Sequence, residues 1–447
     1  MNGGLRHDIP TRLWKILNLI LMAASFALVW YPYYSVHAQV QYYRKGDWVV
    51  IAMFAVLYFV LCRSYEGFNI STNQKSEVIY SQFLALLVTD FVMFMFIWLL
   101  SLDFPNVFPM AMSLAIQVGI SILWAWFGQA WYFKVNKPRK SVVVAENRDG
   151  FDKLVADYGM DKKYDVQGTL SVDETLSNLE ILKDYQTIFM AGIHSHDRNI
   201  ILKYCVEQGV EVLMIPRVGD VIMGSARKMH MFHLPIMQVR RYHPLPEYII
   251  FKRAFDIVCS LFFLIVFSPF MLITAIAVKS DGGPALYKQK RLTKDGKEFY
   301  ILKFRSMRVD AEKDGVARLS TGDKDDRITK VGKVIRAIRF DELPQVFNIL
   351  KGEMSIVGPR PERPEIAAQY EKDIPEFRLR LQAKAGLTGY AQVYGKYNTT
   401  PYDKLLMDLM YIGHPSIIED LRICFATVKI LFMKESTEGV EEGKTTA

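Results

Sequence analysis

The sequence predicts a membrane protein of mixed class built from three parts. Four apolar runs fill the first third of the chain, short β-branched runs alternate with helical stretches in the middle, and a fifth apolar run carries a proline near its centre. These patterns indicate a four-helix transmembrane bundle, a Rossmann-like α/β domain, and a monotopic α+β domain that enters the membrane through a re-entrant helix. The predicted ranges are 1–136 for the bundle, 137–240 for the Rossmann-like domain, 244–433 for the α+β domain, 252–279 for its re-entrant helix and 434–447 for a disordered tail.

The bulk composition agrees with such a mixture. Hydrophobic residues make up 51% of the 447 residues, and the formal net charge is +8. A basic balance suits an anionic partner, such as a lipid surface, a phosphate or a nucleotide. Nucleic acid is not predicted as a partner, because the basic residues cluster beside apolar runs and the sequence has no zinc-finger spacing or basic helix.

The four leading apolar runs are read as transmembrane helices, each of which needs about 20 residues to span a bilayer. They are Leu13–Tyr33, Trp48–Leu61, Phe83–Ser101 and Pro109–Phe133. Lysine and arginine are concentrated before the first run, at Arg6 and Arg12, and after the fourth run, in "KVNKPRK". Because positive charge favours the cytoplasmic side, both ends of the bundle are predicted in the cytoplasm.

From Ser141 onward the sequence has the alternating pattern of an α/β domain. Runs such as "SVVVA", "TIFMAG" and "VEVLMIP" alternate with helical stretches such as "NIILKYCVEQG". This alternation predicts a small parallel sheet with helices between its strands. The first strand continues into "SVVVAENRDGF", which lacks the G-x-G-x-x-G turn that binds a dinucleotide phosphate. We therefore expect a Rossmann-like domain without its usual cofactor.

The fifth apolar run, Ile257–Val278, differs from the others because Ser268-Pro269 lies in its middle. Proline removes a backbone donor and clashes with the preceding helical turn. Basic residues flank the run on both sides, which places both flanks in the cytoplasm. A helix that dips into the bilayer, breaks at Ser268-Pro269 and returns satisfies this rule, provided that the freed backbone groups find Ser268 or neighbouring protein. An ordinary kinked transmembrane helix is the alternative.

Two adjacent carboxylates, Asp341 and Glu342, stand out in the stretch "IRFDELPQVFNILKGEMSIVGPRPERPE". Apolar residues recur there at helical spacing, and Pro344 is tolerated only in a first turn. The helix is therefore predicted to begin at Asp341 or Glu342 and to stop at Lys351-Gly352. A helix N-terminus favours ionised carboxylates and also attracts phosphate. The alternative is that Asp341 is only an N-cap and Glu342 an ordinary first-turn charge.

Basic residues surround this pair in the sequence. Arg360 lies between two prolines, whose fixed φ angles pre-position its guanidinium for bidentate phosphate contact. A hairpin is predicted around Lys294-Asp295-Gly296, and its second strand leads to two further cations. The candidate phosphate or nucleotide contacts are Lys303, Arg305, Arg336, Arg339, Arg360 and Arg363. Together with a membrane surface, these groups predict phosphoryl transfer onto a lipid, with a divalent metal held by oxygen ligands.

The stretch "FDELPQVFNILKGEMSIVGPRPERPE", preceded by "KFRSM" and followed by "AGLTGYAQVYGK" and "MDLMYI", resembles the bacterial sugar transferases, the monotopic phosphoglycosyl transferases. With four leading helices and a Rossmann-like insert, the chain is similar to their long subgroup, the polyprenyl-phosphate hexose-1-phosphate transferases. The specific motifs cover about Lys252–Leu431, and Ser268-Pro269 matches the helix-breaking pair of the family. Two departures are Ala385, where the family usually has proline, and Tyr390, where it often has tryptophan.

The resemblance implies a two-step reaction. Asp341 would be the nucleophile that attacks the β-phosphate of a UDP-sugar, expelling UMP and leaving a sugar-phosphate on the carboxylate. Glu342, together with Asp341, would bind Mg²⁺ and assist proton transfer from the acceptor. Undecaprenyl phosphate would then become undecaprenyl-diphosphate-hexose, which is the first membrane step of capsule, exopolysaccharide or O-antigen assembly. Glucose and galactose are the usual sugars of the long form, and no residue selects between them.

The resemblance also implies a location and partners. We expect a multi-pass protein of the bacterial cytoplasmic membrane, with its catalytic domain on the cytoplasmic face and in contact with membrane lipids. Formation of a homodimer and binding of polysaccharide-assembly proteins stay open. Two other functions stay open as well: a catalytically idle scaffold for polysaccharide assembly, and an ordinary glycosyltransferase, which would release UDP instead of UMP.

Overall fold

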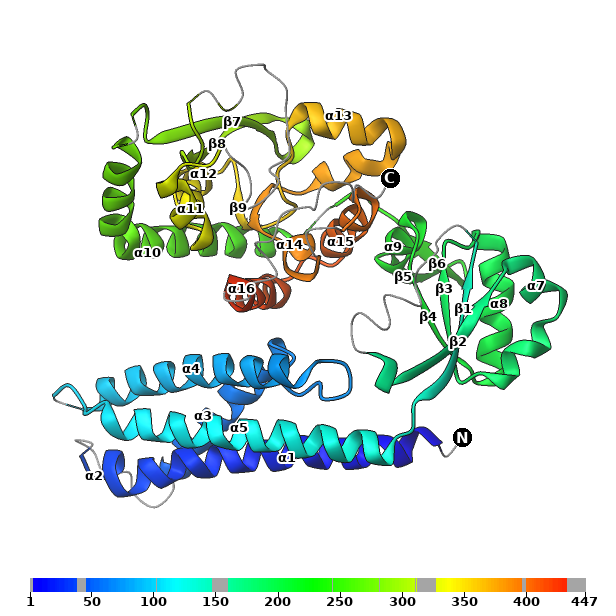
Figure 1. Cartoon of the computed structure of the whole chain (residues 1–447), viewed down its shortest axis with the longest axis horizontal. Helices are drawn as coiled ribbons and strands as arrows, with labels where there is room; N and C mark the ends of the chain where they lie inside the picture. Colours follow the sequence, from blue (N-terminus) through cyan, green and yellow to red (C-terminus); the bar gives the residue numbers. More distant parts are fainter. Residues whose placement is uncertain are drawn as a thin grey trace. The chain divides into compact units, whose positions relative to one another are not determined.

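The computed structural model describes residues 3–37, 46–101, 103–146, 160–242, 244–280, 282–309, 311, 327–395 and 399–431. Contacts divide the chain into two compact units, Met1–Ile215 and Pro216–Ala447 (Figure 1). The predicted disordered tail, 434–447, lies outside the described residues.

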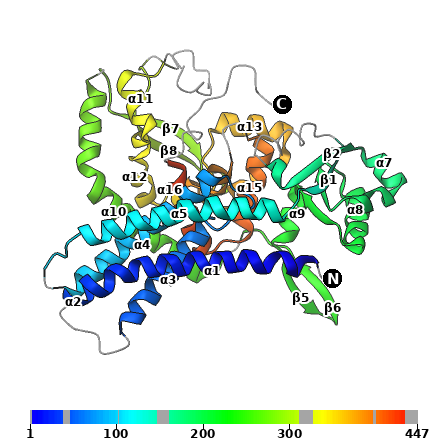
Figure 2. The same cartoon turned by 60° about the horizontal axis from the view of Figure 1, so that its bottom comes forward.

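The first unit begins with long apolar helices. They are α1 (Gly3–Val29), continued by a π-helical turn η1 (Trp30–Tyr34) and α2 (Ser35–His37), then α3 (Gly46–Ser64), α4 (Lys75–Leu100) and α5 (Phe108–Val135). All four predicted runs fall on these helices, which are long and apolar enough to cross a membrane. Helices α1 and α4 each contact both α3 and α5 (Figure 2). Between 33% and 39% of each span is buried, so the remaining apolar surface is available to lipid.

A parallel sheet follows in the same unit. Its strands are β1 (Arg139–Ala145), β2 (Tyr164–Leu170), β3 (Thr187–Ala191) and β4 (Glu211–Met214), in the order β2-β1-β3-β4. The helical segments are η2 (Met160–Lys162), α7 (Val172–Ser177), η3 (Leu179–Asp184) and α8 (Ser195–Gln208).

Side chains alternate between the two faces of this sheet. Val142 and Val144 pack on one face with Ile201 of α8, whereas Val143 and Phe189 pack on the other. This alternation is what a strand covered on both sides requires. The predicted parallel α/β sheet is therefore present, and its description as Rossmann-like stays a prediction.

The second unit carries paired strands and the remaining helices. Its described strands are β5 (Arg227–Met231), β6 (Leu234–Gln238), β7 (Leu286–Leu292), β8 (Glu298–Phe304), β9 (Ser355–Val357) and β10 (Gly386–Thr388). Its helices are α9 (Val218–Gly224), α10 (Pro246–Lys279), α11 (Lys330–Ala337), α12 (Gln345–Lys351), α13 (Pro364–Asp373), α14 (Tyr390–Tyr394), α15 (Pro401–Gly413) and α16 (Ile417–Leu431). The 3-10 segments in the described part of this unit are η4 (Lys294–Gly296), η6 (Phe340–Glu342) and η7 (Pro375–Gln382).

Two of these strand pairs, β5–β6 and β7–β8, are antiparallel, and β9–β10 is parallel. The turn η4 between β7 and β8 confirms the predicted hairpin. Helix α9 packs against α15, so α9 and the β5–β6 hairpin, which fall inside the range 137–240, belong to this unit. The domain boundaries at residues 136 and 240 stay predictions.

Helix α10 is one helix of 34 residues, although Pro269 lies inside it. Figure 1 shows it as two arms that meet at a steep bend, as expected where proline interrupts the hydrogen-bond ladder. Pro269 has no N–H to donate to the carbonyl of Ile265, and the hydroxyl of Ser268 donates to that carbonyl instead, at 3.1 Å. The expected break is thus a bend within one helix, and Ser268 supplies the compensating donor. The re-entrant path through the membrane stays a prediction.

The N-terminal arm of α10 is tied to several elements of its unit. Lys252 forms a 2.9 Å ion pair with Asp420 of α16. Arg253 donates to two carbonyls at the end of α12, each at 2.7 Å, where the helix dipole favours a cation. Asp256 accepts a hydrogen bond of 2.9 Å from the backbone N–H of Ile356 in β9. The apolar helix is therefore held in a fixed place on the α+β core.

Replacing Arg253 should reveal how much this attachment stabilises the unit. Arg253→Met leaves two carbonyls of α12 without their charged donor, so the free energy of unfolding should fall by roughly 1.5–3 kcal/mol. Urea unfolding of the detergent-solubilised protein, followed by circular dichroism, measures this change. Arg422→Met is the matched control, because Arg422 forms an exposed pair with Glu419 at 3.3 Å. Its loss should cost under about 1 kcal/mol. Equal costs in the two variants would contradict the assignment.

Candidate active site

The carboxylate pair lies on the single turn η6, directly before α12. Arg339 precedes the turn in the left-handed region, with φ 58°, and Pro344 is the N-cap of α12, which begins at Gln345. The prediction that this helix begins at Asp341 or Glu342 is therefore wrong by three residues or more. The reason is Pro344, which cannot donate to the carbonyl of the residue four positions earlier, so the chain makes a tighter 3-10 turn first. The predicted stop at Gly352 is confirmed, with φ 85°.

The turn is fixed to the bend of the apolar helix through aromatic contacts. Phe340 lies beside the rings of Phe267 and Phe270, with centroids 6.2 Å apart in both pairs. These two residues bracket Ser268-Pro269 in the sequence. Phe340 also packs against a buried cluster that includes Val278 of α10. The backbone that carries Asp341 is thereby held at the point where α10 changes direction.

Glu342 is held as an anion by two cations. Its Oε1 atom lies 2.8 Å from Nζ of Lys303, on β8, and 3.9 Å from Nη2 of Arg360. Burial alone would raise the pKa of Glu342, but the charges of Lys303 and Arg360 outweigh it and lower the pKa to about 2. Glu342 is therefore ionised throughout the neutral pH range.

Asp341 is shifted in the opposite direction. Burial and the neighbouring charge of Glu342 raise the pKa of Asp341 to about 6, although Lys303, Arg336 and Arg339 act against the shift. The two adjacent carboxylates thus titrate in different ranges, an arrangement that separates their chemical roles. At neutral pH Asp341 is mostly ionised, and its raised pKa makes it a stronger nucleophile than an ordinary carboxylate.

A side chain that sequence reasoning missed aligns β8 with the turn. Asn348 of α12 is fully buried, donates to the carbonyl of Tyr300 at 2.8 Å, and accepts from the N–H of Leu302 at 3.0 Å. The amide bonds to the backbone of β8 as a neighbouring strand would. It thereby aligns β8 with α12, and the next residue of β8, Lys303, lies beside Glu342. The only signal in the sequence is a polar amide inside the apolar run "VFNIL".

Four of the six predicted phosphate contacts gather around the carboxylates. The charges of Lys303 and Arg360 lower the pKa of Glu342. Those of Lys303, Arg336 and Arg339 act to lower the pKa of Asp341. Arg363 is the N-cap of α13, and its charge contributes to lowering the pKa of Arg291. Its role as a phosphate contact stays a prediction.

Arg305 contacts the end of α10. Its residue is 7% exposed, and its Nη2 atom donates at 2.9 Å to the carbonyl of Val278 at the end of α10. The strand β8 ends at Phe304, so the side chain that follows turns toward α10. Arg305 therefore ties the end of β8 to α10, and its role as a phosphate contact stays a prediction.

The residues present fit a shared metal ion better than an enclosed one. Among the described residues, no three His, Cys, Asp or Glu side chains converge on a metal-binding point. The pair Asp341 and Glu342 offers two carboxylates, and Mg²⁺ is usually held by one or two carboxylates together with substrate phosphates. The donor set is therefore compatible with a Mg²⁺ ion that the substrate helps to bind.

Comparison with known proteins places this site in a recognised family. The family model described as "Bacterial sugar transferase" matches residues 247–434, which include α10, the carboxylate pair and the arginine loop. An exopolysaccharide production protein PSS of Rhizobium leguminosarum bv. phaseoli is 42% identical over 190 residues, covering 40% of this chain and 94% of that protein.

Two further relatives extend this comparison. A UDP-N-acetylgalactosamine-undecaprenyl-phosphate N-acetylgalactosaminephosphotransferase of Aeromonas hydrophila is 36% identical over 234 residues, 52% of this chain and 54% of its own. A UDP-glucose:undecaprenyl-phosphate glucose-1-phosphate transferase of Caulobacter vibrioides is 38% identical over 209 residues, 45% of this chain and 78% of its own. The match thus spans about half the length of the Aeromonas protein. The chain belongs to the bacterial sugar transferase family, in the long form in which apolar helices and an α/β sheet precede the transferase region.

Proposed function

We propose that this protein transfers hexose-1-phosphate from a UDP-hexose to undecaprenyl phosphate, giving undecaprenyl-diphosphate-hexose and UMP. The observation that carries the proposal is the pair Asp341 and Glu342, whose pKa values are moved apart and which faces Lys303 and Arg360 at the bend of an apolar helix. Relatives named for undecaprenyl phosphate and for UDP-glucose or UDP-N-acetylgalactosamine support the choice of substrates.

The first step forms a covalent intermediate. A carboxylate oxygen of Asp341 attacks the β-phosphorus of the UDP-hexose, and the bond from that phosphorus to the oxygen bridging the two phosphates breaks. UMP leaves with the bridging oxygen and its electron pair. The hexose-1-phosphate remains on Asp341 as an acyl phosphate.

The second step returns the enzyme to its starting state. A phosphate oxygen of undecaprenyl phosphate attacks the same phosphorus, and the bond to the Asp341 oxygen breaks. The carboxylate is restored and a lipid diphosphate is formed. One phosphoanhydride replaces another, so no external energy source is required.

The surrounding groups would stabilise charge, assist proton transfer and bind the metal ion. Lys303 and Arg360 place positive charge where the phosphate oxygens gain negative charge in the transition state. Glu342 would assist proton transfer from an acceptor that arrives protonated, and because its pKa is lowered it would pass the proton on to solvent. When bound by Glu342 and Asp341, Mg²⁺ would neutralise the charge of the diphosphate.

The membrane brings the lipid acceptor to the carboxylates. We propose that the four leading helices cross the bacterial cytoplasmic membrane, while α10 enters from the cytoplasmic face, turns at Ser268-Pro269 and returns. The exposed apolar surface of α10 supports this path, since 11% of its most apolar window is buried. Because Phe340 contacts the bend, the turn that carries Asp341 would be held close to the part of α10 that enters the membrane, where the lipid phosphate is available.

The hexose is proposed to be glucose or galactose, and the name of the Caulobacter relative supports glucose. The name of the Aeromonas relative adds N-acetylgalactosamine to the sugars that need testing. A panel of UDP-glucose, UDP-galactose and UDP-N-acetylgalactosamine, supplied with undecaprenyl phosphate, would identify the substrate from the rate of UMP release.

The reaction itself is tested by replacing the nucleophile. Asp341→Asn removes the attacking carboxylate with almost no change in shape, so UMP release should fall by at least about 10³-fold. Asp373→Asn, an exposed carboxylate at the end of α13, is the matched control and should stay within about two-fold of the unaltered protein. Release of UDP would indicate an ordinary glycosyltransferase. No UMP above the Asp341→Asn background would favour the scaffold function.

The pH dependence of the reaction should follow the ionisation of Asp341. Burial and Glu342 raise its pKa to about 6 and the nucleophile must be ionised, so kcat/KM should rise between pH 5 and pH 7 and then level off. Initial rates of UMP release across this range give the profile. A rate independent of pH between 5 and 7 would contradict the assignment of Asp341.

Replacing Lys303 should move this profile. Lys303 lowers the pKa of both carboxylates, so Lys303→Met should shift the midpoint of the profile to higher pH and also lower kcat/KM. Lys290→Met is the control, because Lys290 forms an exposed ion pair with Glu298, at 3.0 Å, on the same hairpin. An unchanged midpoint in Lys303→Met would show that Lys303 does not act on Asp341.

A further inference from the structure

The loop that carries Arg360 has every one of its carbonyls held by a separate donor. This arginine loop, Pro359–Glu362, connects β9 to α13. Its donors are the backbone N–H of Gly386 for Pro359 at 2.9 Å, Nη2 of Arg380 for Arg360 at 2.9 Å, Nη1 of Arg291 for Pro361 at 3.1 Å and the N–H of Leu292 for Glu362 at 2.9 Å. A loop bonded at four consecutive carbonyls by other segments has little freedom to move.

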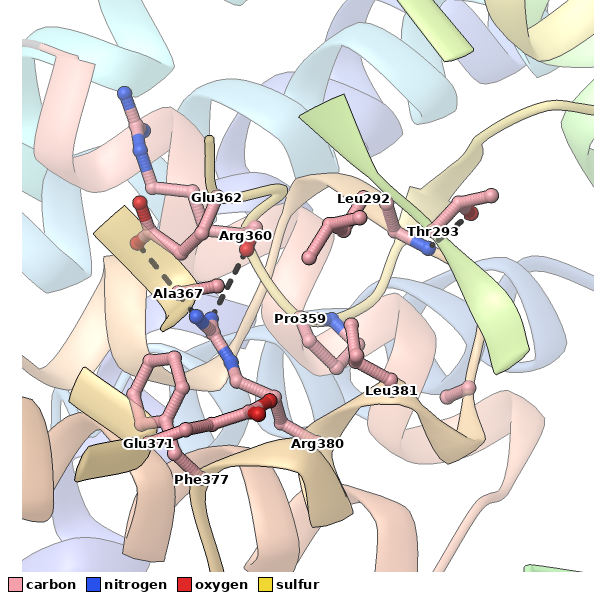
Figure 3. A pocket seen from close by; sticks show the side chains of 12 residues that line it. Leu292, Thr293, Pro359, Arg360, Glu362, Ala367, Glu371, Phe377, Arg380 and Leu381 are labelled. Atoms are coloured by element: carbon pink, nitrogen blue, oxygen red, sulfur yellow. Dashed lines mark hydrogen bonds and ion pairs between the residues drawn. The ribbon is translucent and has the colours of Figure 1, made fainter. Parts of the chain in front are cut away.

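Arg380 is the donor that holds the carbonyl of Arg360 itself. The side chain of Arg380 is 4% exposed, and it contacts Asp408 at 2.6 Å and Glu362 at 3.6 Å. Figure 3 shows the contact with Glu362. Its guanidinium also lies over the ring of Phe377, 4.9 Å from the centroid. Nε and Nη2 face Asp408, Nη1 faces Glu362, and Nη2 reaches the carbonyl of Arg360.

The planar guanidinium of Arg380 thus faces three different partners at once. A lysine ammonium is a compact charge and could not reach Asp408, Glu362 and the loop carbonyl together. A buried ion cluster is weak evidence for stability, because packed apolar residues often serve as well or better. The geometry therefore indicates that the cluster fixes a conformation.

The conformation in question is the direction of the Arg360 side chain. Figure 3 shows the carbonyl of Arg360 turned toward Arg380, while its side chain extends away from the pocket. Pro359 and Pro361 restrict the backbone on both sides, but the loop could still tilt as one piece. The hydrogen bond from Arg380 prevents that tilt. The Arg360 side chain is 46% exposed, and its guanidinium lies 3.9 Å from Glu342.

We propose that Arg380 is a positioning residue for phosphate recognition: it touches no substrate, and it acts by fixing the backbone from which Arg360 reaches the diphosphate of the sugar donor. This inference rests on the proposed function. A misplacement of about 1 Å at such a contact can cost about 10²-fold in rate.

A double-substitution experiment tests this inference. In the full-length detergent-solubilised protein, Arg380→Lys should lower kcat/KM for UMP release by about 10- to 100-fold. If Arg380 acts through Arg360, the same change made in an Arg360→Ala background should lower kcat/KM by less than about two-fold, because the group to be positioned is gone. An equal factor in both backgrounds would overturn the inference.

Lys252→Met provides the matched control, since it also breaks a buried ion pair, that with Asp420. Its effect on kcat/KM should be the same factor with and without Arg360, because its partners hold α10 and not the arginine loop. Should Arg380→Lys fail to fold, Glu362→Gln removes one anionic partner of Arg380 and is judged by the same two outcomes. Failure of the unaltered protein to release UMP would instead refute the proposed function.

Discussion

The missing N–H of Pro269 is the constraint on which the arrangement of the transferase unit depends. It leaves the carbonyl of Ile265 to the hydroxyl of Ser268 and bends α10 where a straight helix would continue. The bend brings Phe267 and Phe270 against Phe340, one residue before Asp341. A single local defect in an apolar helix therefore fixes where the turn that carries Asp341 lies relative to α10.

The two carboxylates can share one turn because their surroundings treat them differently. Lys303 lies 2.8 Å from Glu342 and offsets the cost of burying its charge, whereas Asp341 meets both burial and a neighbouring anion. Glu342 therefore stays ionised and raises the proton affinity of Asp341. This asymmetry depends on the alignment of β8 with α12, which the buried amide of Asn348 fixes.

Local patterns in the sequence predicted the features that depend on neighbouring residues in the chain. Run length predicted the apolar helices, β-branched alternation predicted the parallel sheet, and the adjacency of Asp341 and Glu342 marked the site. The contact of Arg305 with the end of α10 was not expected, because a pattern does not show where a strand ends and a side chain turns. Arg380 was missed for a similar reason: in "FRLRLQ" it resembles Arg378, yet Arg378 is exposed and Arg380 is 3% exposed. Which of two such arginines is buried depends on contacts with distant segments.

The attachments of α10 indicate why the membrane and the chemistry are coupled in one unit. Lys252, Arg253 and Asp256 lie within five residues of one another along one arm, and each bonds to a different element of the core. Since each bond costs desolvation of a charge, their combined effect lies more in fixing one orientation than in adding stability. In the proposed re-entrant arrangement, an apolar helix held in one orientation would also fix the place of the turn η6 relative to the bilayer, because Phe340 contacts the bend of that helix. The proposed meeting of the lipid phosphate with Asp341 would then depend on the geometry of a single helix.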